Sequence, residues 1–164
     1  MNLDTLFSIA SSTSALGWML LVARLLLGGR VEVALLARAA LWLGGRLLPV
    51  LLSVGYAAAI ALWWRSAPGG FDSLDGVATL FTTRGLLLAG WVHYLAFDLW
   101  VGRWQIDTLN ATPTPGWLAR FVAVPCLLMT FLFGPVGLLM FLLLLRVLRG
   151  LRPPGNTVHA HIPF

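Results

Sequence analysis

The sequence predicts an all-α integral membrane protein, a bundle of four transmembrane helices with a short interfacial helix between the second and the third. Three observations lead to this prediction. Hydrophobic residues make up 59% of the 164 residues and charged residues only 10%, against about 25% charged in a typical soluble domain. The mean hydropathy is +0.88. The apolar residues gather into four stretches, and a spanning helix needs about 20 such residues. A soluble globular domain and a disordered chain are therefore excluded.

The net charge of +5 does not indicate a nucleic-acid-binding protein. All 11 basic residues are arginines, and they are spread thinly between apolar runs. They form no basic stripe and belong to no groove-reading motif. In so apolar a chain, scattered arginines more often mark the ends of membrane spans.

The first two apolar stretches predict two spanning helices. The first runs over residues 3–27 and is interrupted only by Arg24 in its most apolar part. It has no basic leader and no clear cleavage site, so we expect a retained helix and not a signal peptide. The second runs over residues 41–64, with Arg46 near its start. Residues 28–40 are expected to connect them.

The connection over residues 65–84 contains a short amphipathic pattern. Asp72 is in a position to cap a helix, with Asp75 three residues later. An apolar face with helical spacing follows, formed by Leu74, Val77, Ala78 and Phe81. This pattern predicts a short helix that lies on the membrane surface.

Two further spans complete the predicted bundle. The third covers residues 85–104. The fourth covers residues 120–149, and we interpret it as one long tilted helix with kinks at Pro125 and at residues 133–135. Residues 1–152 then form a single four-helix transmembrane domain, and the Pro-rich residues 153–164 form a flexible tail.

Four spans place both termini on one side of the membrane and gather polar residues in one leaflet. Arg24, Arg46, Asp98, Arg103 and Arg120 fall in or near that leaflet. Asp98 lies about 5 Å beyond the middle of the third span, at 1.5 Å per residue. His93 lies near the middle itself. A charge at such depth costs about 2.5–3.5 kcal/mol and usually faces a partner or a wet cavity.

Spacing along the third span selects candidate partners for Asp98. Tyr94 lies four residues earlier and shares its helical face. His93 and Arg103 are each five residues away, so neither is well placed to pair with Asp98 on the same helix. Arg24 and Arg46, from neighbouring helices, are the better charge partners. Two interpretations stay open, a catalytic group and a structural lock that fixes helix register.

Aromatic residues and histidines provide the other candidates. Trp18, Trp91 and Trp100 are candidates for lining a pocket for a flat apolar ligand. His159 and His161 have the spacing of a chelating pair, but they lie in the predicted tail. Cys126 has no cysteine partner and is expected to pack as a small apolar residue. We therefore expect no metal site.

Three segments resemble a known family. They are the runs FDSLDGVATLF (71–81), GWVHYLAFDLWVGRW (90–104) and VPCLLMTFLFGPVGL (124–138). They are similar to the abscisic-acid-deficient-four-like family, whose plant members are neoxanthin synthases. The resemblance covers roughly residues 70–149, and HYLAFD followed by VGRW is its most specific part. It implies a four-helix membrane protein that isomerises a carotenoid epoxide to an allenic alcohol without a redox cofactor.

The resemblance and the polar cluster together suggest a function. We expect an intramembrane isomerase of a carotenoid or related isoprenoid epoxide, with no cofactor, in which Asp98 is the base and His93 or Tyr94 the acid. Arg103 completes the expected catalytic group. The alternative is a non-catalytic membrane protein that binds a pigment or lipid or supports a membrane complex.

The expected surroundings of the chain follow from the same arguments. Its partners are membrane lipids and an apolar isoprenoid or carotenoid ligand, with no nucleic acid. Because the residues before Arg24 contain no arginine, we expect no plastid transit peptide, and this favours a bacterial inner membrane. Its orientation stays open, because the predicted topology places six arginines on one side and five on the other. The sequence does not indicate the oligomeric state.

Overall fold

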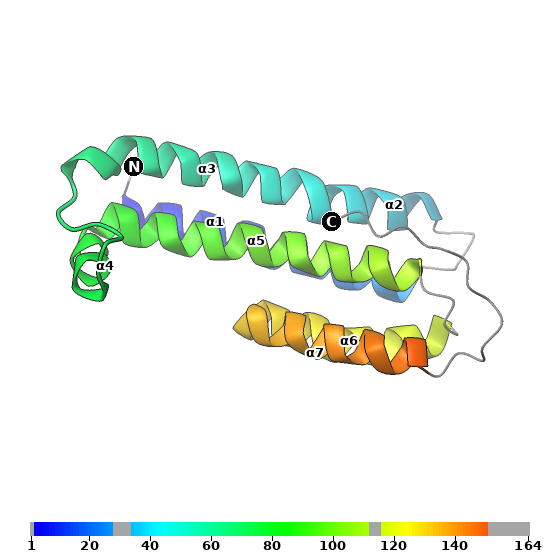
Figure 1. Ribbon diagram of the computed structural model, residues 1–164. Coiled ribbons are helices and arrows are strands. Elements are labelled where there is room, and N and C mark those ends of the chain that lie inside the picture. Colours follow the sequence, from blue (N-terminus) through cyan, green and yellow to red (C-terminus); the bar gives the residue numbers. More distant parts are fainter. Residues whose placement is uncertain (1, 28–33, 112–115, 151–164) are drawn as a thin grey trace.

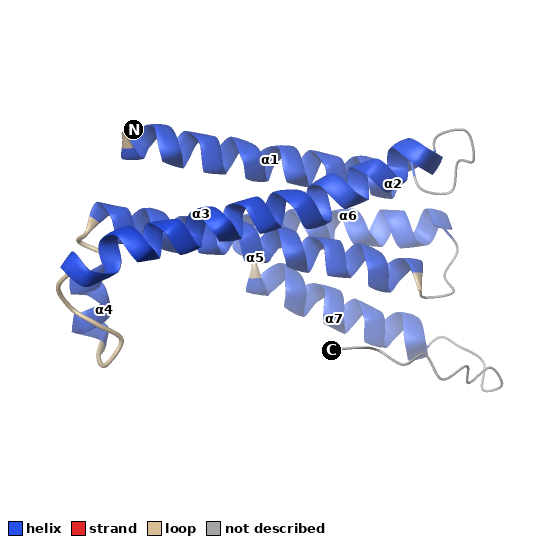
Figure 2. Ribbon diagram, turned by 90° about the horizontal axis from the view of Figure 1, so that it is seen from above, coloured by secondary structure: helices blue, strands red, loops and turns tan. Residues whose placement is uncertain are grey.

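The computed structural model describes residues 2–27, 34–111 and 116–150, and these ranges contain helices and loops but no strand (Figures 1 and 2). Three of the helices are long and apolar enough to cross a membrane. This confirms the all-helical class and the apolar helices. The fourth predicted span has a different structure, described below.

The first helix, α1 (Leu3–Leu27), has the predicted bounds. The second is longer than predicted. α2 (Ala34–Trp42), a π-helical segment η2 (Leu43–Leu47), α3 (Leu48–Trp63) and a 3-10 turn η3 (Trp64–Ser66) follow one another as a single 33-residue helix. The π segment contains two adjacent buried glycines, Gly44 and Gly45.

The predicted surface helix is present as α4 (Leu74–Leu80), but its cap differs from the prediction. Ser73 is the N-cap, and its Oγ accepts a 3.0 Å hydrogen bond from the Gly76 backbone N–H. Asp72, the expected cap, lies one residue further out. Leu74 and Phe81 keep an exposed apolar face on this helix, at 84% and 38% exposure.

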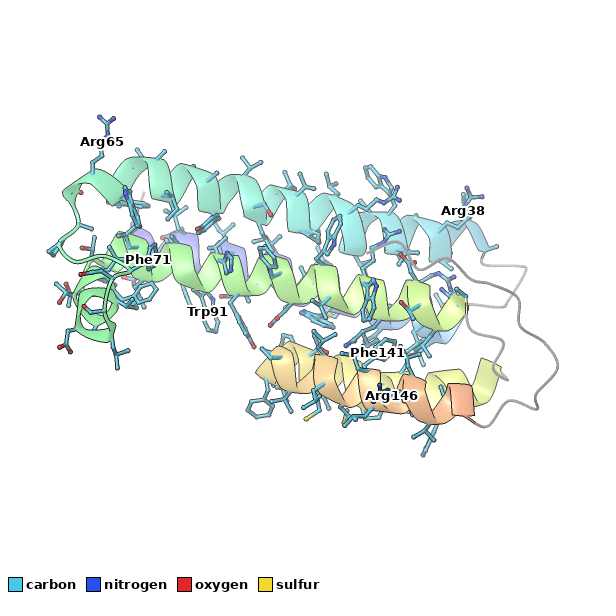
Figure 3. All side chains as sticks on the ribbon, in the orientation of Figure 1. Arg38, Arg65, Phe71, Trp91, Phe141 and Arg146 are labelled. Carbon is cyan, nitrogen blue, oxygen red and sulfur yellow. The ribbon has the colours of Figure 1, made fainter. Side chains whose placement is uncertain are left out.

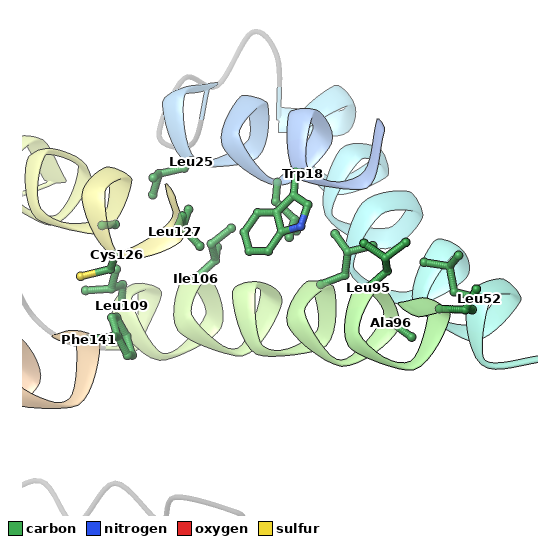
Figure 4. Packing of buried hydrophobic residues seen from close by; sticks show 14 of the residues in the cluster. Trp18, Leu25, Leu52, Leu95, Ala96, Ile106, Leu109, Cys126, Leu127 and Phe141 are labelled. Carbon is green, nitrogen blue, oxygen red and sulfur yellow. The ribbon is translucent and has the colours of Figure 1, made fainter. Parts of the chain in front are cut away.

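The central helix of the bundle is α5 (Arg84–Asn110), which packs against α1, α3 and α6. It continues six residues past the predicted end of the third span. Glycines permit its close approach to α1. A Cβ on Gly102 would lie 2.7 Å from the Trp18 ring, and one on Gly17 would lie 2.8 Å from Leu99. Figure 4 shows Trp18 above α5 among the buried apolar side chains of this contact.

The prediction of one long fourth helix is wrong. The stretch forms two shorter helices, α6 (Gly116–Phe133) and α7 (Pro135–Gly150), which pack against each other as a hairpin. Gly134 has a φ of +43°, a left-handed conformation that glycine adopts without strain. Pro135 has no N–H to continue α6, and it starts α7 instead. At Pro125, where a kink was also expected, α6 continues.

Small residues allow the two arms of the hairpin to touch. A Cβ on Gly137 would overlap the backbone and the hydroxyl of Thr130, so α7 can lie directly on α6 only because residue 137 is a glycine. Phe141 and Leu145 of α7 are then buried, at 0% and 4% exposure. The Phe133-Gly134-Pro135 break therefore reverses the chain.

The reversal changes where the chain ends. α6 and α7 lie along the second half of α5 only, and α7 ends at the same end of the bundle as α1 and α5 (Figure 1). α1 begins at the opposite end of the bundle, the end where α4 also lies (Figure 1). Among the described residues, the predicted placement of both chain ends on one side is therefore wrong.

Candidate functional site

The hairpin tip lies against Asp98, near the middle of α5. A Cβ placed on Gly134 would lie 2.8 Å from Asp98 Oδ1, so the carboxyl group is in contact with the turn. Asp98 is only 8% exposed. The sequence placed His93 nearest the middle of this helix, but because α5 continues to Asn110, Asp98 is the more central of the two.

The electrostatic environment of Asp98 comes from the hairpin. Within the described ranges Asp98 has no ion pair, and its Oδ2 atom has no hydrogen-bond partner. The first turn of a helix carries N–H groups without intrahelical partners and a partial positive charge. Because α7 begins at Pro135, directly after the turn, its positive end lies beside this carboxyl group.

Tyr94 lies one turn before Asp98 on the same face of α5. Its hydroxyl donates a long, 3.5 Å hydrogen bond to the Phe131 carbonyl oxygen near the end of α6. Trp91 stacks on Tyr94 with ring centroids 5.7 Å apart, and its Nε1–H donates to Ser11 Oγ at 3.0 Å. Tyr94 therefore joins α5 to the hairpin, and Trp91 joins α5 to α1.

A cleft of about 780 Å³ opens beside these residues. We call it the α1–α5 cleft. Its walls come from the first turns of α1, the end of α4, the first half of α5 and the tip of the hairpin. The residues that line it are Leu3, Asp4, Phe7, Phe81, Arg84, Leu87, Leu88, Gly90, Trp91, Tyr94, Leu95, Phe131 and Leu132. Its volume lies within the usual range for small-molecule sites.

Polar groups lie at the two ends of the α1–α5 cleft. At the outer end, Arg84 Nη2 pairs with Asp4 Oδ1 at 2.7 Å, with both side chains about two-thirds exposed (68% and 67%). At the inner end lies Tyr94, ten residues or about 15 Å further along α5. Trp91 projects from the side of α5 that faces the hairpin (Figure 3). The walls between are apolar.

A second, shallower groove of about 570 Å³ runs between α1 and α6. It is lined by Ala15, Trp18, Met19, Val22, Ala23, Leu26, Val124, Leu127, Leu128 and Phe131. Phe131 borders both hollows and contacts the Trp18 ring edge-on at 5.7 Å. This groove contains no titratable side chain among its lining residues.

The structure brings together only some of the predicted site residues. Tyr94 and Trp91 line the α1–α5 cleft, and Asp98 lies at the hairpin tip beside it. Trp18 is buried between α1 and α5 and lines the second groove.

His93 and Trp100 lie elsewhere. His93 faces α3, where its ring lies 5.3 Å from Tyr56, and it also lies 4.5 Å from Phe97, one turn further along α5. Trp100 is 53% exposed. Neither residue lines the α1–α5 cleft or the second groove.

The predicted arginine partners of Asp98 do not pair with it. The ion pairs that the described residues form are Arg84–Asp4 and Arg103–Asp107. Arg24 has a buried Nε atom without a hydrogen-bond partner, and Arg46 lies in the π segment η2. The expectation of an Arg24 or Arg46 partner is therefore wrong, because the hairpin, which the sequence analysis did not foresee, lies against Asp98.

Arg103 makes its polar contacts with Asp107 and with the second helix, away from the hairpin tip. Its Nε donates to Asp107 Oδ2 at 3.0 Å and its Nη1 to the Leu41 carbonyl oxygen at 3.2 Å. Leu41 lies two residues before the π segment, near the point where the hydrogen-bond pattern of the helix changes. Gly45 leaves room for the Arg103 stem, since a Cβ there would lie 2.5 Å from Arg103 Cδ. Arg103 thus joins α5 to the second helix.

Sequence analysis missed a buried polar contact between α5 and the hairpin. Gln105 Nε2 donates to Thr130 Oγ1 at 2.9 Å, and Thr130 Oγ1 donates to the Cys126 carbonyl oxygen at 2.9 Å. Gln105 and Thr130 are 1% and 0% exposed. Gln105 lies directly after the predicted end of the third span, at residue 104. Thr130, a hydroxyl inside a long apolar run, was the signal that could have revealed the contact.

The described residues contain no cluster of three or more metal-binding side chains. His159 and His161 lie outside the described residues. Cys126 is buried and free, as expected for a packing residue.

Comparison with known proteins places the chain in a family. The model of the family described as ABA DEFICIENT 4-like matches residues 5–141. The match extends the resemblance found at residues 70–149 to the first two helices, and it includes the hairpin tip and Asp98. The comparisons with curated proteins and with solved structures return no match. Because the family model covers most of the sequence, the chain belongs to the ABA DEFICIENT 4-like family.

Proposed function

We propose that this protein is a multi-pass membrane protein that isomerises a carotenoid or related isoprenoid epoxide within the bilayer. The membrane placement is supported by three long apolar helices and by the outward apolar side chains. Met19, Leu62 and Phe121 are 62%, 69% and 77% exposed, a surface that lipid would cover. In this placement α1, α2–α3 and α5 span the bilayer, and the α6–α7 hairpin enters and leaves on one side.

The observation that carries the proposal is the position of buried Asp98, one helical turn past Tyr94, which lines the inner end of an apolar cleft; among the described residues Asp98 has no ion pair. A buried carboxylate without a charge partner is costly in a membrane and is a functional candidate for that reason. The apolar walls suit a hydrocarbon ligand, and the volume of about 780 Å³ accommodates an end ring with part of a polyene. Family membership supports the same class of substrate.

The two side chains supply the acid and the base that the reaction needs. Tyr94 gives its hydroxyl proton to the epoxide oxygen as the adjacent carbon–oxygen bond breaks. Asp98 takes a proton from a polyene carbon, and the electron pair of that carbon–hydrogen bond forms the new double bond of the allene. The product is an isomer of the substrate, so the reaction requires no oxidant or reductant.

The neighbouring positions of the two groups also suit turnover in a dry site. After the reaction Asp98 carries a proton and Tyr94 is a phenolate. Because the two residues lie one turn apart on the same helical face, the proton can return from Asp98 to Tyr94. The next cycle then needs no proton from water.

The test is pigment analysis in a host that makes an epoxy-carotenoid. The wild-type chain should produce an isomeric allenic pigment. Asp98→Asn should lower conversion by about 100-fold or more, the usual contribution of a positioned acid or base. Asp75→Asn makes the same chemical change on the exposed face of α4 and should convert normally. Normal conversion by Asp98→Asn, at equal protein levels, would remove Asp98 from the mechanism.

A second candidate is favoured by the contact of Asp98 with the hairpin turn. In this case the Asp98 carboxylate stabilises the N-terminus of α7, and the protein binds a pigment or lipid without changing it. In that case purified protein carries an unmodified pigment in stoichiometric amount. Asp98→Asn then lowers the thermal stability and leaves the pigment profile of the host unchanged.

A further inference from the structure

The α6–α7 hairpin redistributes the arginines of the chain between the two ends of the bundle. A single long fourth helix would carry Arg146 and Arg149 to the end where α4 lies. The hairpin returns them to the end where α1 and α5 finish (Figure 1). Arg38 and Arg65 lie at opposite ends of the bundle, and Arg146 projects from the hairpin (Figure 3).

The resulting charge asymmetry is large. In the half of the bundle where α1 and α5 finish, the described helices carry seven arginines and two acidic residues. These are Arg24, Arg38, Arg46, Arg103, Arg120, Arg146 and Arg149, with Asp98 and Asp107. At the other end, the described chain carries two arginines and three acidic residues. These are Arg65 and Arg84, with Asp4, Asp72 and Asp75.

We infer that the arginine-rich end faces the cytoplasm and that the α1–α5 cleft opens toward the opposite leaflet. Arginines near the ends of spans are retained on the side from which a membrane protein is inserted. Anionic lipids of the cytoplasmic leaflet also attract juxtamembrane arginines. The mouth of the cleft lies at the arginine-poor end, because Asp4, Phe81 and Arg84 line it.

This orientation determines the leaflet from which a ligand enters the α1–α5 cleft. The hairpin fills the cytoplasmic half of the bundle, and the cleft occupies the outer half. An apolar ligand therefore reaches Tyr94 and Asp98 from the leaflet away from the cytoplasm. The inference on orientation rests on charge and topology and is independent of the proposed reaction.

The test is cysteine labelling in intact cells with a membrane-impermeant maleimide. Cys126→Ala removes the chain's 1 native cysteine. Ser66→Cys then reports the arginine-poor end, and Ala39→Cys reports the arginine-rich end. Both positions are exposed, and neither substitution changes a charge.

The expected result is labelling of Ser66→Cys in intact cells and labelling of Ala39→Cys only after the membrane is permeabilised. The reverse pattern would overturn the inference, and so would equal labelling of the two sites in intact cells. The experiment involves no pigment. A failure of the proposed isomerase therefore leaves this result unaffected, and a reversed orientation leaves the isomerase proposal intact.

Discussion

The two halves of α5 lie in different surroundings, although they belong to one continuous helix. The second half packs against α6 of the hairpin, where Gln105, Ile106 and Leu109 are 1%, 1% and 4% exposed. Most of the first half lies beyond the hairpin, whose tip reaches only as far as Tyr94. There Leu87 is 56% and Trp91 40% exposed, and both line the α1–α5 cleft.

The difference shows how a small bundle can build a site without a soluble domain. The hairpin reverses at Gly134 and so fills only part of the length of the bundle. Where it stops, α5 presents a carboxyl group against the turn and a tyrosine toward the unfilled part. The length of the hairpin therefore sets the position of the site along the bundle.

The contrast between the two halves should disappear if the hairpin cannot form. We expect Gly137→Leu to be the most damaging change, because its side chain would overlap the backbone of Thr130. Overpacking of this kind costs about 3 kcal/mol when the backbone itself must move. Thermal unfolding in detergent measures the loss. Wild-type stability in this variant would mean that α7 does not lie on α6.

The turn itself is expected to be less sensitive. Gly134→Ala must hold a left-handed conformation, which costs a residue with a side chain about 1–2 kcal/mol. Its methyl group would also crowd Asp98 Oδ1. Gly55→Ala is the matched control, since a Cβ there has nothing within 4 Å. We expect lower thermal stability for the first variant and unchanged or higher stability for the second. Equal effects would argue against the turn.

Loss of the buried hydrogen bond between Gln105 and Thr130 should lower the stability by a smaller amount. Thr130→Val keeps the shape of the side chain but leaves Gln105 Nε2 without its acceptor. Hydrogen bonds of this type in membrane proteins contribute about 0.6 kcal/mol on average. The double variant with Gln105→Leu should recover part of the loss, as measured by thermal unfolding. Strictly additive losses would show that the two side chains do not interact.

The smallest effect on stability is expected for the exposed ion pair at the mouth of the α1–α5 cleft. Asp4→Asn removes the ion pair with Arg84, whose partners are two-thirds exposed. Exposed pairs contribute less than about 1 kcal/mol, and salt screens them. The difference in unfolding temperature between wild type and variant should shrink at high ionic strength. A difference that does not depend on salt would contradict a purely electrostatic role.

The helices could be predicted from the sequence, because apolar length and amphipathic spacing are local properties. The bounds of α1 follow from its apolar run, and the shared face of Tyr94 and Asp98 follows from their spacing of four residues. The chain reversal could not be predicted with the same certainty. A Gly134-Pro135 step is compatible with a kink as well as with a turn. The tertiary packing of Gly137 on Thr130 determines that the step forms a turn and not a kink.

The errors at the candidate site have the same origin. The prediction of Arg24 and Arg46 as partners of Asp98 assumes that neighbouring helices supply the opposite charge. The hairpin provides a helix N-terminus at that position instead, which residue spacing along the chain does not reveal. Sequence analysis groups His93 with Asp98 because both lie near the middle of the third span. His93 lies on a different face of α5 from Asp98, and α3 packs on that face with Tyr56 beside His93.

The chain reversal at Gly134 is the central claim, and a distance between the outer ends of α6 and α7 tests it most directly. Spin labels would be placed at Phe121→Cys and Val147→Cys in the Cys126→Ala background, at side chains 77% and 59% exposed. The hairpin predicts a separation of about 10–20 Å, since packed helices lie 8–10 Å apart. A single continuous helix would separate the two positions by about 39 Å, at 1.5 Å per residue. A measured distance near the larger value would contradict the account.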